Sequence, residues 1–295
     1  MYVKKLAFSS LFITGSWILF YELDPYVLAK LTTPETVAVY AVGLTLLSFY
    51  RSIFGALFNP FTARFNHLIG LNDEVSLRGL YSTVIIVLLP IVVFAIVPLV
   101  FFTNHFIYAW LGSHYEQSIW PARLLILSNI LAYITYPASI MLVAKQRLRT
   151  LNIISAVLPI LYWSIVLFFF KQFGINAFAG AKLITFLFAG ILYLKFSLTF
   201  LKTDLLCFIK KYILPIIPSV VCIIVFLSTA NYFIEIKDKN YNSLLLVILL
   251  ALVSCVPALV CYYFFSYPFR TYILMLVRKT RNKLLPVNHS KIQEL

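Results

Sequence analysis

The stretch from Tyr40 to Arg64, Y-A-V-G-L-T-L-L-S-F-Y-R-S-I-F-G-A-L-F-N-P-F-T-A-R, decides how this chain folds. The run is apolar for long enough to cross a bilayer, and it carries one cation, Arg51, well inside it. A charge at that depth costs at least ~2.5 kcal/mol on insertion scales, so it faces protein or water rather than lipid. We expect the helix to stop at Asn59-Pro60 and Arg51 to face a polar cavity.

The composition places the whole chain in a membrane. Of its 295 residues, 62% are hydrophobic and 12% are charged, and the mean hydropathy is +0.95. Soluble domains carry about 25% charged residues, so this chain lacks the polar residues that would coat a soluble core. We therefore predict an all-α fold, a polytopic membrane helix bundle.

About eight transmembrane helices of roughly 20 residues each are expected. The predicted spans are 6–28, 36–58, 80–102, 118–142, 151–171, 175–200, 212–234 and 243–266. We expect 1–200 to form a six-helix membrane lobe, 201–268 to add two accessory transmembrane helices, and 269–295 to be a basic cytoplasmic tail resting on anionic lipid or free in solvent. An N-terminal signal peptide ending near Val27-Leu28-Ala29 is the alternative to a first span.

The net charge of +14 is a topology signal rather than a sign of nucleic-acid binding, because most cations lie in short connectors. Sixteen cations fall at the N-terminus, in 59–79, 143–150 and 201–211, and after 267, whereas four fall on the opposite side. These four are Lys30, Lys171, Lys237 and Lys239. The bias predicts a multi-pass protein of the cytoplasmic (inner) membrane with both termini cytoplasmic.

Two connectors are longer than turns. Residues 59–79 mix apolar and charged side chains, which is typical of a short helix on the membrane surface, although a plain loop is equally compatible. The outer connector from Thr103 to Ser118 holds Trp110 and Tyr115, aromatic residues that favour the headgroup region.

Five charged side chains are predicted at or near membrane depth: Glu22, Asp24, Arg51, Arg123 and Lys182. One interpretation is that the three cations line a substrate path and attract an anion such as a pyrophosphate, which suits the planar donor fork of arginine. The alternative is that Arg123 or Lys182 pairs with Glu22 or Asp24 and ties helices together. Either carboxylate is also a candidate for coupling to protons or sodium, because buried carboxylates titrate.

Four short motifs resemble the polysaccharide and O-antigen flippases of the multidrug/oligosaccharidyl-lipid/polysaccharide (MOP) exporter superfamily. They are V-A-V-Y-A-V-G-L from Val37, F-N-P-F-T-A-R-F from Phe58, W-L-G-S-H-Y from Trp110 and F-G-I-N-A-F-A-G-A from Phe173. The resemblance implies a flippase that moves an undecaprenyl-pyrophosphate-linked sugar unit, and hence a lipid-linked anionic oligosaccharide and membrane lipids as partners. It assigns no role to Arg51 or Lys182 individually.

The chain departs from this family in its helix number. Members have 12 to 14 helices, and the eight expected here resemble the C-terminal lobe plus two accessory helices. The expectation is therefore a flippase or its C-terminal half, working with a separate N-terminal lobe chain or with a copy of itself.

Two other functions stay open. A membrane-embedded polysaccharide polymerase or glycosyltransferase would need acid–base groups, which the outer connector offers only in Glu116, His105 and His114. A non-transporting truncated subunit is the other alternative. We expect no enzyme activity, no cofactor, no metal site and no nucleic-acid partner, because the sequence shows no phosphate-cradling glycine loop and no metal-ligand spacing.

Overall fold

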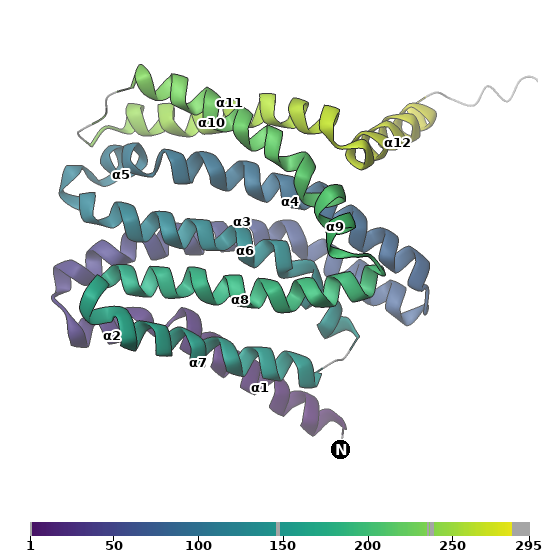
Figure 1. Ribbon diagram of the computed structural model, residues 1–295, viewed down its shortest axis with the longest axis horizontal. Coiled ribbons are helices and arrows are strands. Elements are labelled where there is room, and N and C mark those ends of the chain that lie inside the picture. The colour runs from purple at the N-terminus through teal and green to yellow at the C-terminus, as the bar shows by residue number, and fades with distance from the viewer. Residues whose placement is uncertain (1, 146–147, 235, 237–238, 285–295) are drawn as a thin grey trace, which may run out of the picture.

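The computed structural model describes residues 2–145, 148–234, 236 and 239–284, and these residues form helices and connecting turns with no strand among them. The helices lie roughly alongside one another in layers, with α1 and α7 at one edge and α10 and α11 at the other (Figure 1). The elements are α1 (Tyr2–Tyr21), α2 (Asp24–Leu31), α3 (Pro34–Gly70), α4 (Glu74–Phe101), α5 (Thr103–Leu111), η1 (Ser113–Ser118), α6 (Ile119–Ala144), α7 (Leu148–Phe173), α8 (Ile175–Leu201), α9 (Leu205–Phe208), η2 (Ile209–Ile213), η3 (Leu214–Ile216), α10 (Ile217–Tyr232), α11 (Tyr241–Phe265) and α12 (Tyr267–Leu284).

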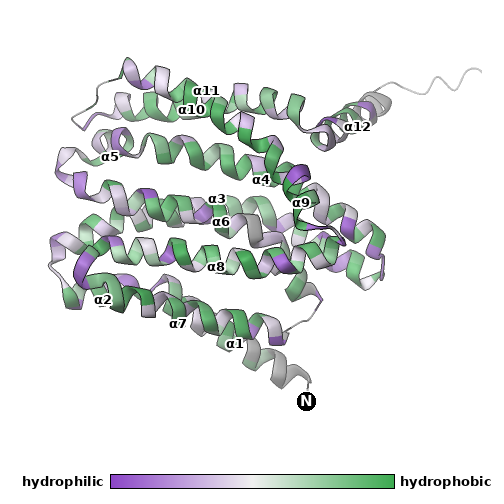
Figure 2. Cartoon of the chain, in the orientation of Figure 1, coloured by the Kyte–Doolittle hydropathy of each residue, from purple (hydrophilic) through white to green (hydrophobic). Residues whose placement is uncertain are grey.

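The predicted membrane helix bundle is confirmed. Among the described residues, six helices are long and apolar enough to cross a bilayer, and a seventh span is formed if the bent segment Ser113–Val143 counts as one. The apolar part of α1, Ser10–Tyr21, is shorter. Hydrophobic residues cover outward as well as inward surfaces of these helices (Figure 2), as expected where lipid is the outer solvent.

The first predicted span, 6–28, is not one continuous helix. α1 ends at Tyr21, and α2 starts at Asp24 with Pro25 in its first turn. Proline is favoured at a helix start because its missing N–H would have no partner there in any case. The break places two carboxylates, Glu22 and Asp24, at the junction of two helices.

The expected stop at Asn59-Pro60 is wrong. α3 continues through Pro60 to Gly70, so 59–70 is neither a separate surface helix nor a loop. At 1.5 Å per residue, the 37 residues of α3 extend about 55 Å, well beyond a hydrocarbon core of ~30 Å. The proline ring removes one helical hydrogen bond, but Phe58 and Phe65 on either side are buried and hold the helix in place.

The connector from Thr103 to Ser118, which the sequence predicts on the outer side, is helical rather than an open loop. It consists of α5 and η1, separated at Gly112, whose φ of 94° favours glycine. The Asn240 N–H donates to the Ala109 carbonyl at 3.1 Å, which ties the turn before α11 to α5. The predicted tail begins as helix α12, and its part beyond Leu284 lies outside the described residues, as do Arg147 and Lys237 of the charge count.

Helix α4 is the centre of the bundle. It packs against α3, α6, α10 and α11, and two-thirds of its most apolar window is buried. Hydroxyl groups join it to its neighbours: Tyr81 to Ser197 at 2.6 Å, and Tyr262 to the Ile86 carbonyl at 3.0 Å. α10 and α11, the predicted accessory pair, pack on each other and on α4.

Gly43 allows α3 and α6 to approach closely, and a side chain there should destabilise the bundle. A Cβ at Gly43 would lie 2.9 Å from Leu125 Cδ1 and 3.1 Å from the Ala122 Cα, which is backbone. We expect Gly43→Ala to lower the free energy of unfolding by about 1–3 kcal/mol through overpacking. The control is Gly180→Ala, where nothing lies within 4 Å and alanine should be neutral or stabilising. Equal unfolding midpoints for the two variants in detergent would contradict the close approach.

Asp73 caps α4 and should make stability depend on pH in the acid range. Its carboxylate accepts from the Ser76 backbone N–H at 3.0 Å, and hydrogen bonds from Ser76 lower its pKa below the usual 3.8. A carboxylate whose pKa is lower in the folded than in the unfolded protein stabilises the fold at pH values above the unfolded pKa. This contribution to stability is lost as the pH falls through the folded pKa. Asn caps helices equally well without titrating, so Asp73→Asn should unfold like the parent at pH 7 and lose less stability between pH 5 and about 3. Parallel pH profiles of the unfolding midpoint would refute this role.

Candidate functional site

A buried ion pair joins the α1–α2 break to α8. Lys182 Nζ lies 2.7 Å from Asp24 Oδ2, and both side chains have no exposed surface. The Tyr40 hydroxyl of α3 donates to the same carboxylate oxygen at 2.8 Å, and Lys182 donates to the Phe20 carbonyl at 2.7 Å. The pair thus connects four helices, α1, α2, α3 and α8, through hydrogen bonds.

Aromatic rings surround this ammonium group. Lys182 Nζ lies 4.7 Å from the ring centroid of Tyr162, 5.1 Å from that of Phe20 and 5.6 Å from that of Tyr21. Such rings attract a cation through their negative faces. Three buried oxygens have no hydrogen-bond partner within the described part of the chain. They belong to Asp24 (Oδ1), to the hydroxyl of Tyr162, whose ring contacts Lys182, and to Thr185 (Oγ1), three residues after Lys182. Partnerless polar atoms at a buried charge make the arrangement sensitive to any change of charge.

Arg51 is held quite differently. Its Nη2 lies 3.4 Å from Glu22 Oε1, and the two side chains are 30% and 54% exposed. The guanidinium carbon lies 4.8 Å from the ring centroid of Tyr21 and 5.2 Å from that of Trp17, both on α1. The Tyr133 hydroxyl of α6 donates to the Arg51 carbonyl at 2.8 Å and fixes the backbone behind the side chain. Arg51 therefore bridges from α3 to α1 by a long, partly exposed contact.

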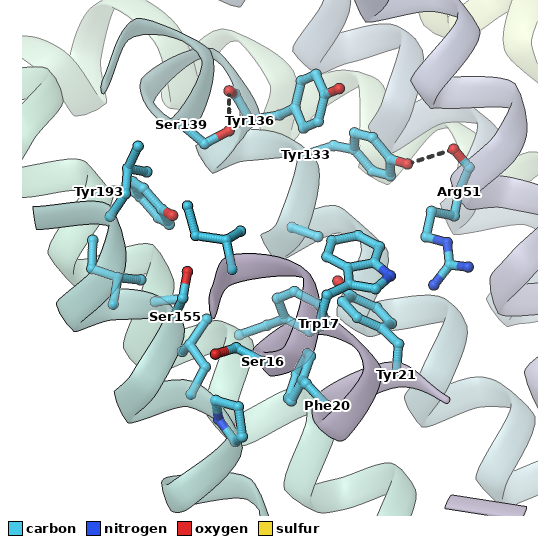
Figure 3. A pocket seen from close by; sticks show the side chains of 18 of the residues that line it. Ser16, Trp17, Phe20, Tyr21, Arg51, Tyr133, Tyr136, Ser139, Ser155 and Tyr193 are labelled. Carbon is cyan, nitrogen blue, oxygen red and sulfur yellow. Dashed lines mark hydrogen bonds between the residues drawn. The ribbon is translucent and has the colours of Figure 1, made fainter. Parts of the chain in front are cut away.

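A cavity of about 380 Å³ lies beside Arg51, between α1, α3, α6, α7 and α8. Figure 3 shows the guanidinium next to Trp17 and Tyr21 and the hydroxyls of Tyr133 and Ser139 on the facing α6. The polar and aromatic lining is Ser16, Trp17, Phe20, Tyr21, Arg51, Asn129, Tyr133, Tyr136, Ser139, Ser155, Phe186 and Tyr193. The cavity therefore combines one cation with hydroxyl, amide and aromatic groups.

The structure brings four of the five predicted charged residues together at the α1–α2 break. Arg51 borders the cavity, and Glu22 contacts the Arg51 guanidinium. Lys182 does not line the cavity; it forms with Asp24 the helix-tying pair that was the alternative interpretation. The pair stands directly behind the cavity wall, because Phe20 and Tyr21 contact both.

Arg123 lies apart from this group. Its guanidinium carbon stands 5.4 Å from the ring centroid of Trp120, one turn earlier on α6, and it does not border the cavity. Its Nε is buried without a partner among the described residues. Neither Arg123 nor Lys182, both predicted as path cations, borders this cavity.

Sequence reasoning missed the aromatic and polar lining. A signal was present on α6, where Asn129, Tyr133 and Tyr136 recur at i, i+4 and i+7 and so share one helix face. On α1, Trp17 and Tyr21 are four residues apart and stack at 4.1 Å. Polar stripes of this kind in an apolar helix mark the side that faces a cavity.

Comparison with known protein families, curated proteins and solved structures gives no match. Within the described residues, no group of three or more His, Cys, Asp and Glu side chains is placed to hold a metal ion. The fold and the site define a multi-pass helical membrane protein with a charged, aromatic-lined cavity among its helices.

Proposed function

We propose that the chain is a flippase for a lipid-linked anionic oligosaccharide, or the C-terminal half of one, and that it moves an undecaprenyl-pyrophosphate-linked unit by alternating access. The observation that carries the proposal is Arg51, an incompletely paired guanidinium on the wall of an aromatic-lined cavity in a membrane bundle. Ionisable side chains that face a cavity inside a membrane bundle mark substrate and ion pathways.

The lining suits both the pyrophosphate and the sugar of this substrate. A guanidinium presents a planar fork of donors to phosphate oxygens. The tyrosine and serine hydroxyls and the Asn129 amide offer hydrogen bonds to sugar hydroxyls, while Trp17 and Tyr193 offer flat apolar faces. The same mixture gives no such fit for an uncharged apolar molecule.

The position of the cavity favours loading from the cytoplasmic side. Its lining runs from Tyr21 and Arg51 to Val143 and Leu151, which flank the 143–150 connector. The cation bias predicts that this connector and both termini lie on the cytoplasmic side of the inner membrane. The described conformation then corresponds to an inward-facing state.

The cavity is partly exposed at the α1–α2 break, where the Arg51 and Glu22 side chains are 30% and 54% exposed. α1 packs along α7, and α3 packs along α6. Arg51 of α3 reaches α1 through the rings of Trp17 and Tyr21, and it reaches the α1–α2 break through the carboxylate of Glu22. We propose that a separate N-terminal lobe chain or a second copy of this chain covers this side, since alternating access requires two bodies that rock against each other.

Filling the cavity should abolish transport. Gly55 lies on α3 one turn beyond Arg51, borders the cavity and has open space around its Cα. In the native host lacking the parental gene, a Gly55→Trp protein should reach the membrane but restore no surface polysaccharide. The control is Gly70→Trp, at the exposed end of α3, which should restore export fully. Full export by the Gly55 variant would refute a path through this cavity.

A further inference from the structure

We infer that Glu22 is a built-in competitor for the anionic headgroup: it holds Arg51 while the cavity is empty and is displaced when a pyrophosphate binds. This inference rests on the proposed function and adds how the site accepts and selects its ligand. It assigns to Glu22 an exchange role in place of the coupling role predicted from the sequence.

The contact between the two groups is loose and accessible. One guanidinium nitrogen, Nη2, reaches one carboxylate oxygen at 3.4 Å. A guanidinium has five N–H donors, and among the described residues Arg51 donates this one side-chain hydrogen bond. Both side chains are partly exposed, at 30% for Arg51 and 54% for Glu22. The remaining donors are therefore available to a ligand in the cavity.

The neighbouring carboxylate shows what a fixed pair looks like in the same turn. Asp24 contacts Lys182 at 2.7 Å, has no exposed surface and also accepts from Tyr40. Glu22, two residues earlier, shows one long side-chain contact, and its side chain is 54% exposed. The α1–α2 break therefore holds one carboxylate rigidly and leaves the other free to move.

The exchange favours multiply charged phosphates. A pyrophosphate offers several oxygens and can take a bidentate, charge-assisted pair of hydrogen bonds, whereas Glu22 here takes one. A ligand with a single negative charge gains little over Glu22, so the site should discriminate against monoanions.

The test is calorimetric titration of the full chain in phosphatidylcholine nanodiscs with inorganic pyrophosphate and with farnesyl pyrophosphate. Glu22→Gln and Glu22→Ala should bind both ligands about three- to tenfold more tightly than the parent, because they remove the competing charge. Glu22→Asp keeps the charge, so its affinity should equal that of the parent or lie between those of the parent and the two uncharged variants. The control is Glu35→Gln, an exposed carboxylate at the start of α3 that does not contact Arg51 and should change nothing. Tighter binding of the farnesyl compound than of inorganic pyrophosphate identifies a lipid headgroup rather than free pyrophosphate as the ligand.

Two failures are distinguishable. If the parent shows no binding beyond that of Arg51→Ala, the proposed function falls, and this inference falls with it. If binding depends on Arg51 but Glu22→Gln and Glu22→Ala bind no more tightly than the parent, the competitor role is overturned and the proposed function stands. The unfolding midpoint of each variant, measured in the same discs, excludes loss of folding as the cause.

Discussion

Replacing Lys182 by methionine should lower the free energy of unfolding by about 3–5 kcal/mol, the cost of leaving one member of a buried ion pair without its partner. Asp24 would then have no cationic partner in a site with no exposed surface, where the Tyr40 hydroxyl is the side-chain donor that the described residues offer it. Its second oxygen already has no hydrogen bond from the described residues. The measurement is equilibrium unfolding in detergent, followed by tryptophan fluorescence.

The matching double variant identifies the cause. Lys182→Met combined with Asp24→Asn removes both charges and keeps an oxygen that accepts from Tyr40, so it should recover most of the lost stability. Lys195→Met removes an exposed lysine from the same helix and should change stability by less than about 0.5 kcal/mol. A double variant as unstable as the single one would contradict the ion-pair explanation.

The second large effect is on export: Arg51→Ala should reduce it to the level of the gene deletion in the native host. The variant removes the one cation that borders the cavity, so no donor fork remains for the pyrophosphate. Arg51→Lys keeps the charge but not the planar fork and should restore export partly. The loss should occur without a loss of stability, because the Arg51–Glu22 contact is long and partly exposed.

Two controls separate this role from the other charged groups. Arg123→Ala should leave export intact, since its guanidinium lies over Trp120 and away from the cavity. The neutral pair of Lys182→Met with Asp24→Asn should also support export if the buried pair only ties helices together. Loss of export in a stable neutral pair would instead favour the ion-coupling role predicted for Asp24.

The helical class and the approximate positions of the spans could be predicted from the sequence because lipid imposes both, although six or seven helices of the described residues, rather than eight, are long and apolar enough to cross a bilayer. Runs of about 20 apolar residues are required to cross the hydrocarbon core, and each of the eight predicted spans corresponds to a helix region of the structure. Helix ends were less predictable. Pro60 suggests a stop, but the buried Phe58 and Phe65 keep α3 helical on both sides of it, and this packing is not visible in the local sequence.

The pairing of the charges could be predicted only as a set of alternatives. Glu22 and Asp24 are two residues apart, and spacing alone does not say which faces α3 and which faces α8. The break after Tyr21 decides this, because it turns Asp24 into the bundle toward Lys182 and leaves Glu22 toward Arg51. The aromatic lining was missed for the same reason: a tyrosine in an apolar helix is equally suited to a core contact, and only the assembled helices show which rings border a cavity.

The most direct test of the account is substrate protection of a thiol beside Arg51. In a variant with Cys207, Cys222, Cys255 and Cys261 replaced by serine, Gly55→Cys places a thiol on the cavity wall, and Gly70→Cys places one outside it. Farnesyl pyrophosphate should slow maleimide labelling at position 55 and not at position 70, and the protection should disappear when Arg51 is changed to alanine. Equal labelling rates at position 55 with and without the ligand would contradict an anion-binding cavity at Arg51.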